Sequence, residues 1–140
     1  MSQNLSLKLF VVLTKSSKAI QERMKKDINN YGMYNSEFAV LEALYSKGKQ
    51  TVRQISDAVL INSGSITYVM DKLEAKGLLE RTDCIEDRRV VYIQMTEEGK
   101  QFMEETFPKH QQVIENVFQD ITDDEKKVLI ELLKRVGKKE

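Results

Sequence analysis

Apolar residues recur at helical spacing over a long stretch at each end of the chain. In residues 5–30 lysines fill the opposite side of the predicted helix, and Gly32 ends it, because glycine suits the position after a helix. The apolar positions of this helix are Leu5, Leu9, Val12, Leu13, Ile20, Met24 and Ile28. A second helix is predicted to begin with a cap at Asn35 or Ser36 and to end at residues 47–49.

The middle of the chain predicts two more helices joined by a tight turn. Thr51 opens the first, and Gln54, three residues later, completes a capping box. After a turn at residues 60–62, the second helix is capped by the last turn residue or by Ser63, and Gly77 ends it. The apolar stripe of this second helix is Ile66, Val69, Met70 and Leu73.

Two β-prone runs follow, at residues 78–82 and 90–95, with a polar loop at residues 83–89 between them. Two helices, a tight turn and then a hairpin are the parts of a winged helix-turn-helix, in order. The predicted fold class is therefore mainly α with a small β-hairpin wing. Such a shape fits a DNA groove.

The last third predicts two helices. Thr96 caps the first, and Thr122 with Glu125 forms a capping box for the second. Pro108 lies inside the first pattern and lacks the backbone N–H that a helix interior needs, at a cost of about 3 kcal/mol. We therefore expect a kink or a break a few residues before Pro108.

These elements predict a single domain over residues 1–140. The winged helix-turn-helix occupies about residues 35–96, and helices at about 5–30 and 97–137 flank it. The flanking helices are expected to pack on each other and on a second copy of the chain, which makes them dimerisation helices. A monomeric helical core is the alternative.

Composition limits the class of protein and its location. A hydrophobic content of 41% with 31% charged residues is ordinary for a soluble globular protein of 140 residues. No apolar run approaches the roughly 18 residues that span a bilayer, and the N-terminus lacks a basic region and a cleavage site. With one cysteine and no export signal, the expected location is the reducing cytoplasm.

The overall charge does not favour nucleic acid. Lysine plus arginine is 22 and aspartate plus glutamate is 22, whereas a DNA-binding domain is usually basic. DNA binding must therefore rest on local placement of charge. On the helix that begins at Ser63, small and hydroxyl residues could approach phosphates closely, although they could also be only a loop and a cap.

Charged residues at the tip of the predicted wing favour DNA. An arginine on a thin β-loop can enter a narrow minor groove, and Asp87 is expected to hold one arginine in place. An ordinary solvated turn is the alternative. The candidate DNA-binding residues are Thr51, Gln54, Ser63, Ser65, Thr67, Tyr68, Lys72, Asp87, Arg88 and Arg89.

At these residues the chain resembles the MarR family of bacterial transcription regulators. The motifs are Leu73-Glu74-Ala75-Lys76-Gly77-Leu78, Asp87-Arg88-Arg89 and Met95-Thr96-Glu97-Glu98-Gly99. Met95 replaces the usual leucine, and Tyr68 stands where many members carry arginine. The resemblance covers nearly the whole chain. The segments SLKLFVVLTKSSKAI and NSEFAVLEALYSKG are similar to the MhqR-like branch, repressors linked to quinones and related aromatics.

The resemblance implies a function. It implies a homodimer that represses transcription from a pseudo-palindromic DNA operator and that a small phenolic, quinone or oxidant releases. The implied ligand site is the cleft between the dimer helices and the winged module. Its aromatic candidates are Phe10, Tyr34, Phe38 and Tyr45, each of which ordinary core packing would also explain.

A cysteine and a histidine are the remaining candidates for chemistry. Cys84 is a candidate redox or electrophile sensor, but the acidic residues beside it disfavour the thiolate. His110 has no partner in helical register, so neither a metal nor a cofactor is expected. No nucleophile–base pair or phosphate-binding glycine loop is present, so an enzyme is not expected. The alternative function is a winged-helix module that binds a protein partner.

Overall fold

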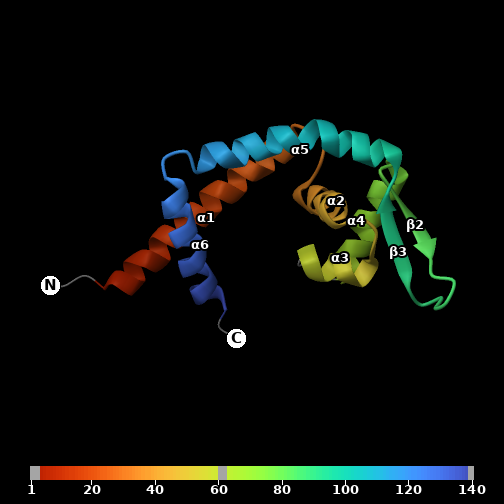
Figure 1. The fold of residues 1–140 in the computed structure, drawn as a ribbon, viewed down its shortest axis with the longest axis horizontal. Coiled ribbons are helices and arrows are strands. Elements are labelled where there is room, and N and C mark those ends of the chain that lie inside the picture. Colours follow the sequence, from red (N-terminus) through yellow and green to blue (C-terminus); the bar gives the residue numbers. More distant parts are fainter. Residues whose placement is uncertain (1–3, 60–62, 139–140) are drawn as a thin grey trace.

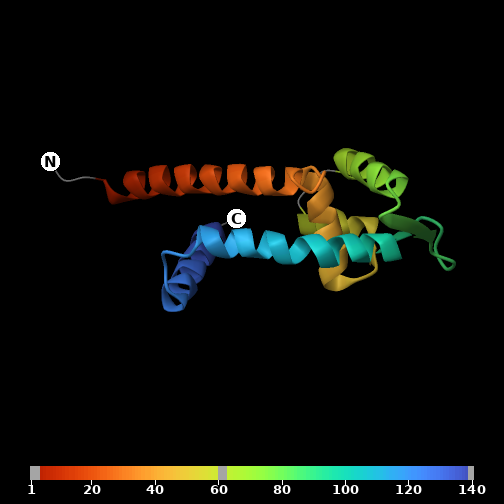
Figure 2. The same ribbon diagram turned by 90° about the horizontal axis from the view of Figure 1, so that it is seen from above.

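The computed structural model describes residues 4–59 and 63–138, and it consists of a winged module and a helical arm (Figure 1). The elements of the module are α2 (Asn35–Lys47), β1 (Gln50–Thr51), α3 (Val52–Val59), α4 (Ser63–Ala75), β2 (Leu79–Asp83) and β3 (Val91–Met95). The arm is built from α1 (Leu5–Asn29), α5 (Glu97–Val117) and α6 (Asp123–Gly137). Figure 2 shows α1 and α5 running alongside each other in opposite directions.

The predicted helix-turn-helix and wing are confirmed, and the sheet has one strand more than predicted. Strands β2 and β3 pair antiparallel, with Arg81 opposite Ile93, and β1 pairs with the other edge of β3. Two residues are too short to show an alternating pattern, which explains why β1 was missed. The predicted turn at residues 60–62 lies outside the described residues.

The core lies where α2, α3 and α4 meet the sheet and the start of α5. The predicted stripe of α4 is fully buried, as are its partners from the other elements. The largest of the fully buried apolar side chains are Phe38, Leu41, Leu44, Ile55, Ile66, Met70, Leu73, Leu79, Ile93 and Met103. Close packing of these side chains fixes how the outer face of α4 is presented.

Three of the predicted caps are confirmed, at Thr51, Thr96 and Thr122. The Thr51 N–H donates to Gln54 Oε1 at 2.9 Å, and the Gln54 N–H donates to Thr51 Oγ1 at 3.1 Å. The same reciprocal bonds join Thr122 and Glu125. The cap of α2 was predicted wrongly, because it is Tyr34, whose N–H donates to Glu37 Oε1 at 2.9 Å.

The predicted break before Pro108 is also wrong. Helix α5 is continuous from Glu97 to Val117 and curves gently over the module (Figure 1). Pro108 and Glu104, one turn earlier, are both exposed, so the carbonyl that loses its partner can bind water. Helices bend with their convex side toward solvent, which accommodates the ring on that side.

No helix among residues 4–59 and 63–138 combines the length and the apolar content needed for a bilayer crossing.

Gly99 in the first turn of α5 allows α5 to pack against the segment that joins α4 to β2. Thr96 Oγ1 donates to the Gly77 carbonyl at 2.6 Å and accepts from the Gly99 N–H at 3.0 Å. A Cβ atom on Gly99 would lie 2.1 Å from the Leu78 carbonyl oxygen. The two backbones therefore approach each other more closely than any side chain permits.

Gly99→Ala should lower the free energy of unfolding by about 1–3 kcal/mol or more, as overpacking does. Gly137→Ala is the matched control, because nothing lies within 4 Å of its added Cβ and alanine favours a helix. Thermal and urea unfolding of both variants measures the effect. Equal stabilities would show that the segment at Leu78 moves at little cost.

Candidate nucleic-acid interface

The outer face of α4 is exposed beside the wing. Ser65, Thr67 and Tyr68 are exposed, and Lys72 is partly covered. All four lie away from the buried stripe, as the sequence predicted. Ser63 begins the helix, but its side chain lies outside the described residues.

The wing presents a guanidinium group that Asp87 holds, as predicted. Asp87 Oδ1 accepts from the Arg89 backbone N–H at 3.0 Å and from Arg89 Nε at 3.2 Å. These two bonds, the backbone bond first, hold the pKa of Asp87 below its usual range. The Arg89 side chain is 91% exposed, so its remaining donors face solvent.

A groove of about 670 Å³ joins α3, α4 and the wing. It brings together three predicted residues, Thr51, Thr67 and Arg89, and it also contains Arg53. Sequence reasoning missed Arg53, although its place on the polar side of α3 was a usable signal. Gln54 is exposed on the same helix, where its side chain holds the Thr51 cap.

Lys72 lies between two aromatic rings. Its Nζ atom is 4.9 Å from the centre of the Tyr34 ring and 5.4 Å from that of Tyr68. Both distances are within the range of a cation–π interaction. Tyr34, which the sequence offered as a ligand contact, is 63% exposed and faces this side of α4.

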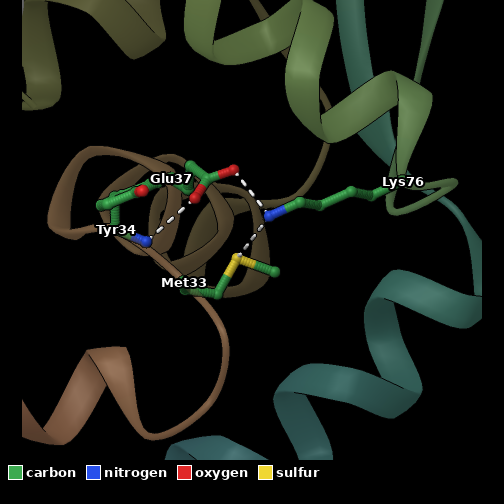
Figure 3. Close-up of polar contacts among 4 residues, drawn as sticks. All are labelled: Met33, Tyr34, Glu37 and Lys76. Carbon is green, nitrogen blue, oxygen red and sulfur yellow. Dashed lines mark hydrogen bonds and ion pairs between the residues drawn. The ribbon is translucent and has the colours of Figure 1, made fainter.

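A buried carboxylate joins the start of α2 to the end of α4 (Figure 3). Glu37 is 1% exposed, and its Oε2 atom accepts from Lys76 Nζ at 2.9 Å. Burial raises the pKa of Glu37, but the Tyr34 N–H and the Lys76 ammonium outweigh burial and lower the pKa overall. No pattern along the chain predicts this pair, because its partners are 39 residues apart.

The remaining ligand candidates have different surroundings. Phe38 is fully buried, with its ring 4.9 Å from that of His110. The Tyr45 ring is 5.6 Å from that of Phe107, and Phe10 is exposed in the second turn of α1. The structure therefore does not gather the four candidates around one cavity within a protomer.

His110 belongs to a buried polar network at the junction of α1, α2 and α5. Its Nδ1 atom lies 2.8 Å from Asp27 Oδ2, and the Tyr31 hydroxyl donates to Asp27 Oδ1 at 2.8 Å. Burial, and then the Asp27 carboxylate, raise the pKa of Tyr31 to about 12. Within the described part of the chain, no three histidine, cysteine or acidic side chains are grouped as a metal would require.

Cys84 lies at the base of the wing loop and is half-buried. Its N–H donates to the Val90 carbonyl at 3.1 Å, and its side chain lines a small hollow with Asp83, Ile85 and Arg88. The hollow therefore places Cys84 beside one acidic residue, Asp83, and one basic residue, Arg88.

An exposed helix of a helix-turn-helix, beside a wing with arginines at its tip, defines the winged helix-turn-helix class of DNA-binding proteins. Comparison with known proteins specifies the family. The MarR family model matches residues 33–91. The HTH-type transcriptional regulator MhqR of Bacillus subtilis is 46% identical over 132 residues, which are 94% of this chain and 91% of that protein. The chain belongs to the MarR family of transcriptional regulators.

Solved structures share the fold. Sco3205 of Streptomyces coelicolor, a MarR-family regulator solved in complex with DNA, aligns with a TM-score of 0.89 and 18% identity over 98% of this chain and 89% of that one. BpsR of Bordetella bronchiseptica, whose DNA binding 6-hydroxynicotinic acid regulates, aligns with a TM-score of 0.81 and 22% identity over 93% and 98% of the two chains. The relatives are transcriptional regulators and not enzymes.

Glu37→Gln should lower the free energy of unfolding by about 1–3 kcal/mol at pH 7, because Lys76 loses its charged partner. The folded-state pKa of Glu37 lies below 4.5, so the charged pair stabilises the wild type above about pH 5. This stability is lost as the pH falls through the lowered pKa. Urea unfolding from pH 7 to pH 3 should therefore show the two proteins converging in acid.

Glu104→Gln, at an exposed position of α5, is the control and should match the wild type throughout. A difference between wild type and Glu37→Gln that stays constant with pH would contradict the assigned charge state.

Proposed function

We propose that this regulator is a homodimeric repressor that binds duplex DNA through α4 and the wing. The observation that carries this proposal is the exposed face of α4, which lies in one groove with the wing residue Arg89. Helix α4 would enter the major groove, and Arg88 and Arg89 would contact the backbone or the minor groove. Sco3205, which has the same fold, was solved with DNA, and this supports the assignment.

The surface of the arm supports the dimer. Leu9, Val12 and Leu129 are exposed in one protomer and line one groove of about 890 Å³, together with Val117 and Leu133. Leu132 is exposed on the same helix as Leu129. Apolar patches of this extent mark an interface, and a second copy of the arm would bury the patch. The chain then acts as one domain, with about residues 35–96 binding DNA.

We also propose that a small aromatic or electrophilic compound releases the DNA. A ligand can release the DNA only if it binds the DNA-free state of the protein more tightly than the DNA-bound state. Regulation of BpsR by a hydroxylated aromatic acid supports an aromatic ligand here. Of the four aromatic candidates, Tyr45 is exposed beside Phe107 at the junction of arm and module and is the contact that we propose, and alkylation of Cys84 is the rival route. A repressor of this kind would act in the cytoplasm.

DNase footprinting upstream of the regulator's own gene should show two half-sites about 34–36 Å apart, or a multiple of this, because a two-fold dimer presents two recognition helices. Arg88→Ala and Arg89→Ala should each need more protein for protection. At least one of the two substitutions should make the plot of log K against log salt less steep by about one unit, which is the contribution of one phosphate contact.

Lys109→Ala is the control, because it removes one exposed positive charge from α5, outside α4 and the wing. Protection of a single unsymmetrical site would argue against the dimer, and no protection at low salt would favour a protein-binding module. If both arginine variants bind like the wild type, the wing is not a contact.

Release of operator DNA by a quinone, and by its hydroquinone, should be the same in the wild type and in Cys84→Ser. This result is expected because reversible pocket binding needs no thiol, whereas alkylation does. Fluorescence anisotropy of labelled operator measures the release. A variant that ignores the quinone and still responds to the hydroquinone would show that the thiol is the sensor.

A further inference from the structure

We propose that Tyr34 is a positioning residue for DNA binding, which holds the Lys72 ammonium group against the outer face of α4 by means of its ring. This inference rests on the proposed DNA-binding function and extends it to a residue outside the helix-turn-helix. The sequence offered Tyr34 only as a ligand contact. Its place in the structure gives it a different partner.

The geometry at Lys72 is that of a cation between two rings. Its Nζ atom is 4.9 Å from the Tyr34 ring and 5.4 Å from the Tyr68 ring. Tyr34 and Tyr68 are 63% and 64% exposed, so neither ring is a core side chain. Tyr68 is one turn before Lys72 on the same helix, whereas Tyr34 approaches from the segment before α2.

The backbone of Tyr34 is itself fixed. Its N–H donates to Glu37 Oε1 at 2.9 Å, and the other oxygen of that buried carboxylate accepts from Lys76 at 2.9 Å (Figure 3). Tyr68 and Lys72 lie on one face of α4, and Lys76 follows four residues later, just after the helix ends. Glu37 therefore binds the Tyr34 backbone and Lys76 together. The Tyr34 ring then lies beside Lys72, which is one turn before Lys76.

This arrangement has a consequence for binding. A lysine on a flexible stem loses side-chain entropy when it contacts a phosphate. Two rings that restrict Lys72 before DNA arrives reduce this loss, which is preorganisation. The phenol hydroxyl of Tyr34 is not needed for this contact, because the ring face supplies the attraction.

The experiment measures the affinity for operator DNA against salt for the wild type, Tyr34→Phe, Tyr34→Leu, Lys72→Gln and the Tyr34→Leu/Lys72→Gln double variant. Tyr34→Phe should bind like the wild type. Tyr34→Leu should weaken binding about threefold to tenfold. Lys72→Gln should weaken binding too, and it should make the dependence of log K on log salt less steep by about one unit. In the double variant the two losses should not add, because they act on one contact.

A second measurement needs no DNA. In the free protein, the nuclear magnetic resonance signals of the Lys72 side-chain methylenes should be shifted by the ring in the wild type and in Tyr34→Phe, and should move back in Tyr34→Leu. Additive losses, a weak Tyr34→Phe, or unchanged methylene signals would overturn the proposal. So would a Lys72→Gln variant that binds normally. Because the wild type would still bind DNA in each of these cases, the proposed function would survive, whereas its failure would appear as no binding by any variant.

Discussion

The position of the recognition helix depends on one buried charge. Glu37 accepts from the backbone that begins α2 and from Lys76 at the end of α4, with almost no exposure to water. A buried carboxylate is costly unless its oxygens are paired, so this site tolerates few alternative arrangements. The apolar core could allow α4 to slide or rotate slightly, but the fixed partners of Glu37 select one placement.

The chain has no net charge, but its positive charges are not all paired within the protein. Arg81 pairs with Asp71 and Glu74, and Lys76 pairs with Glu37, so two cations of the module are paired within the protein. Arg89 is different, because Asp87 orients it while its side chain stays 91% exposed. A protein with no overall positive field can therefore present positive charge at chosen points, and its attraction for DNA would act at short range.

The sequence predicted what depends on neighbours along the chain. The stripe of α4, the capping box at Thr51 and the wing each have a period or a spacing that is visible in the residues, and each is confirmed. Contacts between distant segments had no such signal. Glu37 with Lys76, and Asp27 with His110, are separated by 39 and 83 residues. The predicted break at Pro108 was wrong for a related reason. Tertiary packing decides that Pro108 faces solvent, where the helix can continue past it.

The junction network connects the two halves of the molecule through one short segment. Asp27 near the end of α1 binds both His110 of α5 and the Tyr31 hydroxyl, and Tyr34 and Glu37 follow within ten residues of Asp27 along the chain. A change in the angle between α1 and α5 would move this segment, and with it the support of Lys72 and Lys76. Residues 27–37 therefore contact α5 at one end and Lys76, just after α4, at the other.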